Sequence, residues 1–230
     1  MKYGSVTAVL LTLLCFSVHA QEAQEQGKRF DLSFGVGIGN RHEIGVLGYP
    51  FTDDGAVYPE FSVTHVPTGL FVSLLATKSP SDGQSQRPQQ VGDYVLSSFG
   101  WAKEMKRVYI QTDFSLYDVE VPGERKRVGS MRLFVGSTRK RFSPYLWLQN
   151  YGGVDAYKVG LDFNRLVSLE VGGNSGISIF GREPLAFSRL KVRTPEIRWL
   201  GKGVATVTFQ HAYELPFEDH AWIDFYWKII

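Results

Sequence analysis

Period-two alternation of apolar and polar residues constrains this chain more than any other feature. Apolar side chains recur at every second position in several separate runs, most clearly at 30–38, 107–116, 157–164 and 221–229. Successive side chains of a β-strand point to opposite faces, so this pattern predicts strands with one apolar and one polar face. No segment has a helical period long enough to compete.

The alternation predicts about twelve strands, with boundaries good to a few residues. The expected strands are 30–39, 57–66, 69–77, 93–103, 107–118, 127–137, 142–151, 154–165, 166–174, 185–198, 203–213 and 220–230.

The connections between these strands alternate in length. Long connections are expected at 40–56, 78–92, 119–126 and 174–184, with tight turns between them, and only Gly152-Gly153 is shorter than the pattern requires. Outer-membrane barrels have short periplasmic turns and longer external loops. The order of connections therefore favours such a barrel over a soluble sandwich.

A membrane location is compatible with strands alone. After residue 20 no stretch is long and apolar enough for a spanning helix, and only helices and closed barrels satisfy every backbone polar group inside a bilayer. Aromatic residues make up 14% of the chain. They are expected to form two interfacial girdles, which comprise Trp101, Trp199 and Trp227 at the periplasmic ends and Tyr58, Tyr94, Tyr151 and Tyr213 at the outer ends. The predicted fold is all-β: an antiparallel up-and-down transmembrane β-barrel of 10–12 strands.

The first twenty residues have the pattern of a cleaved secretory signal. Lys2 provides the positive start, an apolar run follows, and small residues precede the expected cleavage after Ala20. We expect residues 21–29 to form a periplasmic tail and 30–230 the barrel, in the outer membrane of a Gram-negative-type cell. Cys15 lies within the signal, so the exported chain can form neither disulfides nor thiolate metal sites.

The strand positions that alternate with the apolar ones hold charged residues of both signs. In a barrel these positions would face the lumen. The expected function is a narrow channel for small polar or anionic solutes. The stripe Arg189, Lys191 and Arg193 would bias it toward anions, although Glu170 and Asp224 could neutralise the stripe and cross-link the wall. The predicted pore-lining residues are Arg107, Asp113, Arg132, Lys158, Asp162, Glu170, Arg189, Lys191, Arg193 and Asp224.

Two hairpins and the closing pair of strands resemble the TorF-type family of outer-membrane porins. The resemblance is carried by Tyr58–His65 (YPEFSVTH) with Pro67–Ser73 (PTGLFVS), and by Ala156–Phe163 (AYKVGLDF) with Val167–Gly172 (VSLEVG). The segments 203–213 and 220–230 fit the family's last hairpin. The resemblance implies an outer-membrane barrel and little about mechanism.

Catalytic motifs are not found in the sequence: there is no phosphate-binding loop, no G-x-S-x-G and no H-E-x-x-H. A histidine beside a carboxylate can activate a serine or a water. The candidates near the outer rim have no fixed spacing, so we expect no enzyme, no cofactor and no metal. These candidates are His42, Asp53, Asp54, Asp219 and His220, with His211 nearby.

The formal net charge of +2 gives no reason to expect nucleic acid. The expected partners are outer-membrane lipids, lipopolysaccharide and the barrel-assembly machinery.

Two other functions remain open. One is a non-conducting scaffold or adhesin that acts through loops 40–56 and 78–92. The other is a soluble periplasmic barrel that binds an apolar ligand, with its apolar parity facing inward.

Overall fold

The computed structural model describes residues 29–39, 42–43, 50–52, 55–78, 93–121, 124–176, 184–197, 202–213 and 219–229. Within these ranges the regular elements are all strands, and no helix long and apolar enough to cross a membrane occurs. The strands are β1 (Phe30–Gly39), β2 (His42–Glu43), β3 (Pro50–Thr52), β4 (Ala56–His65), β5 (Leu70–Thr77), β6 (Tyr94–Met105), β7 (Val108–Val121), β8 (Glu124–Ser137), β9 (Phe142–Tyr151), β10 (Val154–Phe163), β11 (Val167–Asn174), β12 (Leu185–Arg193), β13 (Lys202–Ala212) and β14 (His220–Lys228).

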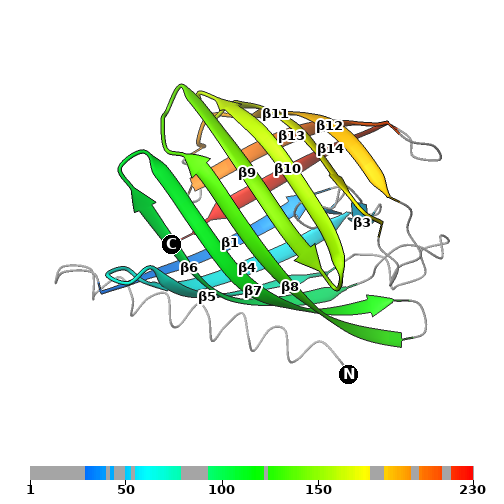
Figure 1. Ribbon diagram of the computed structural model, residues 1–230, viewed down its shortest axis with the longest axis horizontal. Coiled ribbons are helices and arrows are strands. Elements are labelled where there is room, and N and C mark those ends of the chain that lie inside the picture. Colours follow the sequence, from blue (N-terminus) through cyan, green and yellow to red (C-terminus); the bar gives the residue numbers. More distant parts are fainter. Residues whose placement is uncertain are drawn as a thin grey trace.

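Twelve of these strands form one closed antiparallel barrel, whose tilted strands surround a single interior (Figure 1). Each strand pairs with its neighbours in the sequence, and β1 closes the wall by pairing with both β4 and β14. The remaining strands, β2 and β3, form a separate two-stranded sheet within the first connection.

The two ends of the barrel differ in their connections. The turn end carries the connections at 66–69, 106–107, 138–141, 164–166 and 194–201, and the loop end carries the others. The longest connections, between β1 and β4 and between β5 and β6, are both at the loop end. The long connections expected at 40–56, 78–92 and 174–184 are all at this end, so the expected alternation is confirmed for these three.

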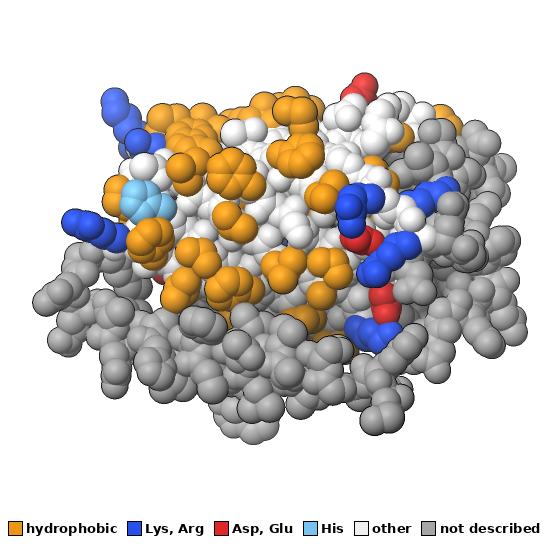
Figure 2. Space-filling view, turned by 90° about the horizontal axis from the view of Figure 1, so that it is seen from below, with side chains coloured by type: hydrophobic (Ala, Val, Ile, Leu, Met, Phe, Trp, Pro, Cys, Tyr) orange, Lys and Arg blue, Asp and Glu red, His pale blue; other side chains and the backbone are white. Residues whose placement is uncertain are grey.

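Strand register sorts the side chains into an apolar outer face and a mixed inner face. Phe99 pairs with Phe114 on the outer face, while the adjacent pair, Ser98 and Ser115, points inward. Figure 2 shows apolar side chains spread over one side of the wall, with lysine and arginine at both ends. The exposed outward residues include Val72, Leu74, Phe99, Phe114, Met131, Leu133, Leu146, Leu148, Val159, Leu169, Val171, Leu190, Val192, Phe209, Ile223 and Phe225.

The interior is filled in two layers. Near the loop end, an apolar layer joins residues of β6 to β10, β12 and β13, among them Tyr117, Tyr151 and Phe187. Tyr117 and Tyr151 meet edge to face with ring centroids 4.7 Å apart. Below this layer, toward the turn end, the buried inward side chains are mostly polar or charged, including Asp113, Lys158, Glu170 and Arg189.

The structure confirms the all-β fold and bears out each expected strand to within a few residues, except at two places. The expected loop 119–126 is wrong: β7 and β8 pair as far as Val121 and Glu124, which leaves a two-residue connection. The tenth expected strand ends at Arg193 rather than 198, because a proline at 195 has no backbone N–H for a ladder. The predicted signal and most of the tail lie outside the described residues.

The predicted tyrosine girdle is largely wrong. Tyr58, Tyr94 and Tyr151 have inward parity, and the last two are buried, so only Tyr213 is exposed at the outer end. Position along a strand sets the height of a side chain, but parity decides its face. Trp101 and Trp227 do face outward at the turn end, as expected, and Trp199 lies outside the described residues.

Candidate functional site in the barrel interior

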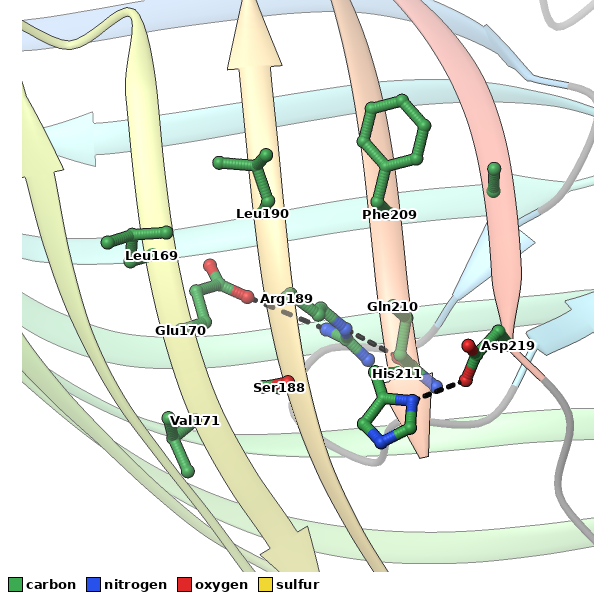
Figure 3. A pocket seen from close by; sticks show the side chains of 11 residues that line it. Leu169, Glu170, Val171, Ser188, Arg189, Leu190, Phe209, Gln210, His211 and Asp219 are labelled. Carbon is green, nitrogen blue, oxygen red and sulfur yellow. Dashed lines mark hydrogen bonds and ion pairs between the residues drawn. The ribbon is translucent and has the colours of Figure 1, made fainter. Parts of the chain in front are cut away.

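A single buried carboxylate, that of Glu170, gathers three cations from neighbouring strands. Lys191 Nζ lies 3.1 Å from Glu170 Oε1, while Lys158 Nζ and Arg189 Nη1 lie 3.5 and 3.7 Å from Oε2. The longer two contacts are ion pairs rather than hydrogen bonds. Figure 3 shows Glu170 and Arg189 side by side on β11 and β12. We call Glu170, Lys158, Arg189, Lys191 and Tyr145 the Glu170 cluster.

The strand register and a glycine at position 160 bring the side chains of this cluster together. Glu170 pairs with Arg189 on one side and with Gly160 on the other. A Cβ at position 160 would lie 2.2 Å from Cζ of Tyr145, so glycine is needed for the Tyr145 ring to pass over β10. The Tyr145 hydroxyl then donates a hydrogen bond to the Glu170 carboxylate.

Aromatic rings and an amide support the cations of the cluster. Arg189 Nε donates to Gln210 Oε1 at 2.6 Å, and its guanidinium stacks 4.1 Å from the centroid of the Phe187 ring. Lys158 Nζ lies 4.7 Å from the centroid of the Trp147 ring. Such cation–π contacts compensate cations for lost hydration.

A second polar cluster lies on the adjoining wall. Arg132 Nε donates to Asp113 Oδ2 at 2.7 Å, and the Asp113 side chain is 0% exposed. Asp113 also accepts hydrogen bonds from Gln111 and Ser115. The Arg132 guanidinium lies 5.1 Å from the centroid of Trp147, so the ring of Trp147 contacts cations from both clusters.

Toward the turn end the charges pair more loosely. Arg193 Nη1 lies 3.3 Å from Asp162 Oδ1 and 2.7 Å from the hydroxyl of Ser168. Asp162 and Arg193 are both partly exposed, whereas Glu170 and Arg189 are buried. The interior is therefore more accessible from the turn end than from the loop end.

Most of the residues predicted to line a pore do lie on the inner face. Arg107 is the exception and a correction: it belongs to the turn after β6 and is exposed, because the strand ends at Met105. Asp224 faces inward from β14 and is partly buried. Glu170 pairs with two members of the cationic stripe, Arg189 and Lys191, and Arg193 pairs with Asp162. One carboxylate therefore faces two cations of the stripe together with Lys158.

The predicted lining residues at mid-height are closed off from water. The side chains of Arg189, Glu170 and Lys158 are 0%, 2% and 4% exposed. Side chains that line a wide aqueous channel would remain accessible to water. Along β10 to β12 the interior is a packed polar core below an apolar layer, whereas the inward Glu60 of β4 and Asp224 of β14 are only partly buried.

The sequence pattern did not predict the aromatic and amide side chains that line the interior on β9. Tyr145, Trp147 and Gln149 alternate with outward Leu146 and Leu148, so they share the parity of the charged set. The signal was present, but aromatic residues at both parities obscured it.

Of the histidine and aspartate residues expected near the outer rim, the structure describes the side chains of two. His211 Nδ1 and Asp219 Oδ1 are 2.6 Å apart, so the structure brings these two together. Asp53 and Asp54 lie outside the described residues, and so do the side chains of His42 and His220. In the described part of the chain no group of three or more His, Cys, Asp or Glu could hold a metal ion.

The fold and its interior define the class: a closed antiparallel barrel of twelve strands with a charged, packed interior. No protein-family model and no curated protein matches the chain. Among solved structures it is similar to the crystal structure of OccAB2 from Acinetobacter baumannii, at 12% identity and a TM-score of 0.39. The match covers 90% of this chain and 66% of that one. The resemblance to the TorF-type family stays a prediction.

Proposed function

We propose that the protein is an integral outer-membrane β-barrel and works as a narrow passage that prefers small anions. The apolar outer face supports the membrane location. Exposed Phe99, Phe114 and Met131 are neighbours on three strands, and contiguous apolar surface of this kind suits a lipid contact. Outer-membrane lipids, lipopolysaccharide and the barrel-assembly machinery are the partners that this location entails.

The Glu170 cluster carries the proposal of anion preference. It sets Lys158, Arg189 and Lys191 against one carboxylate, so positive charge predominates at this level. Stripes of lysine and arginine bias a pore toward anions. We place the constriction of the passage at the cluster, because Arg189, Glu170 and Lys158 are buried at mid-height.

A non-conducting barrel is the second candidate. The observation that favours it is the burial of Arg189 and Glu170 below the apolar layer of Tyr151 and Phe187. Such a protein would act through its external surface. The apolar-ligand alternative is disfavoured, because it requires the apolar parity to face inward and the exposed apolar residues face outward.

Planar bilayer recording separates the two candidates. The protein is purified in detergent from outer membranes, and its folding is checked by the gel shift between unheated and boiled samples. We expect small single-channel steps and a reversal potential that shows anion preference in a salt gradient. Replacing Arg189, Lys191 and Arg193 with glutamate should reverse this preference. An inserted protein that gives no steps would support the non-conducting barrel, and an unchanged preference would remove the stripe from the passage.

A further inference from the structure

A groove of about 630 Å³ crosses the outer face of the wall over strands β11 to β14. Its lining includes Ser188, His211 and Asp219, which Figure 3 shows on three successive strands or at their ends. None of these residues belongs to the interior clusters. The floor of the groove also includes Glu170, Arg189 and Gln210, which have inward parity, so the groove shares its strands with the Glu170 cluster. The three polar residues stand on the outward face, which the proposed function places against lipid.

Strand register places the three polar residues in one row. Ser188 on β12 pairs directly with His211 on β13, and both have outward parity. Side chains directly opposite on antiparallel strands have Cβ atoms about 4.5–5.5 Å apart, so rotamer changes can bring serine and histidine into hydrogen-bond range. Asp219 immediately precedes β14, on the far side of His211 from Ser188.

The His211 ring is held on its other side. An aspartate carboxylate only accepts hydrogen bonds, so the contact of 2.6 Å to Asp219 places a proton on Nδ1. This leaves Nε2 as the basic nitrogen of the neutral ring. Tyr213 contacts the same ring edge to face, with centroids 5.0 Å apart.

We propose that Ser188, His211 and Asp219 form a hydrolytic site for the acyl esters of membrane lipids. Ser188 is the nucleophile, His211 the general base and acid, and Asp219 the positioning residue. Nucleophile, base and orienting carboxylate stand in that order across the row. A rotamer change at Ser188 or His211 completes the hydrogen bond between them that serine activation requires. This site runs against the expectation from sequence that the protein is not an enzyme.

The reaction needs only an ester and water. Ser188 Oγ attacks the carbonyl carbon while His211 Nε2 takes the hydroxyl proton. The bond from the carbonyl carbon to the alcohol oxygen then breaks, and His211 returns the proton to that oxygen. Water attacks the acyl-serine, His211 takes a proton from this water, and the proton returns to Ser188 as the fatty acid leaves.

The lining of the groove selects the substrate class. The row next to the polar one, toward the turn end, consists of Leu169, Leu190, Phe209 and Ala221 on the same outward face. An acyl chain can lie along this apolar row while its ester stands at the polar row. His211 is one residue from the loop end of β13, which is the level where lipid esters meet water in the proposed orientation.

The first test is covalent labelling with a fluorophosphonate, which forms a bond to an activated serine and releases fluoride. Detergent-purified protein with an intact heat shift is labelled, digested and mapped by mass spectrometry. We expect phosphonylation of Ser188, reduced about a hundredfold or more in His211→Phe. The matched controls are Ser97→Ala, an outward serine between Leu74 and Leu116, and His65→Phe at the turn end. Absence of labelling at Ser188 would overturn the proposal.

The second test measures release of fatty acid from a diacyl phospholipid in mixed micelles. Release should fall to background in Ser188→Ala, and Asp219→Asn should lower kcat with KM unchanged. Equal release by folded Ser188→Ala would show that the serine is not the nucleophile. Labelling of Ser188 without release would overturn the assignment of lipid esters as substrate. The proposal relies on membrane embedding but not on conduction, and extraction from outer membranes tests the embedding separately.

Discussion

Lys191 Nζ lies 3.1 Å from Glu170 Oε1, between two strands that pair antiparallel, and the Glu170 side chain is 2% exposed. The same carboxylate faces Lys158 and Arg189. Buried ion pairs add little net stability as a unit, but removal of one partner leaves an uncompensated charge. Removing one charged member of the cluster should therefore lower the stability of the barrel strongly.

Replacing Glu170 with glutamine should destabilise the barrel by about 3–5 kcal/mol, because three cations lose their carboxylate in a buried site. The free energy of unfolding in urea, followed by tryptophan fluorescence in lipid vesicles, measures this change. Glu104→Gln is the control, since Glu104 is exposed. Equal stability of the two variants would mean that water or another group solvates the cations.

Asp113 and Arg132 should be energetically coupled. A double-mutant cycle with Asp113→Asn and Arg132→Gln is expected to give roughly 1–3 kcal/mol, since Asp113 is fully buried. The same β7–β8 hairpin offers a comparison pair on the outer face, Asp118 and Arg127, whose side chains are 27% and 68% exposed. Arg125 is changed to glutamine throughout this cycle, because its Nε also lies 2.6 Å from Asp118. The pair of Asp118 and Arg127 should give about 0–1 kcal/mol. Similar values for both pairs would contradict a dry interior.

Gly160→Ala should displace Tyr145 from Glu170, because the new Cβ would lie 2.2 Å from Cζ of that ring. We expect a loss of about 1–3 kcal/mol in the free energy of unfolding. Gly129→Ala is the control, since its Cβ would lie 3.5 Å from the nearest atom. Adding Tyr145→Leu should make the Gly160→Ala change nearly neutral. Additive losses would show that the strain arises elsewhere.

An arginine at Met131 tests the membrane location. Met131 is 67% exposed, so in a soluble barrel the substitution should change stability by about 0.5 kcal/mol or less. On a lipid face near mid-height the cost should be about 2–4 kcal/mol. Unfolding from vesicles is compared for Met131→Arg and for Ser137→Arg, which lies at the turn end of the same strand. Equal effects would count against a bilayer around this wall.

Most of the wall could be predicted from the sequence, whereas the candidate sites could only be predicted in part. The runs at 30–39 and 154–165 match β1 and β10 to within two residues, because period-two alternation is a local property of each segment. The inward set of charges followed from the same parity. The pairing of Asp113 with Arg132 did not, since it depends on which residues stand opposite across β7 and β8.

The sequence by itself determined that the chain forms amphipathic strands, which residues share a face, and where the longest loops gather. Tertiary structure decided that β1 closes on β14, that Tyr94 and Tyr151 fill the interior, and that Ser188 stands beside His211. The physical reason is that alternation fixes the face of a side chain within its own strand. Strand register, which is set by pairing between distant segments, fixes the neighbours of that side chain on the next strand.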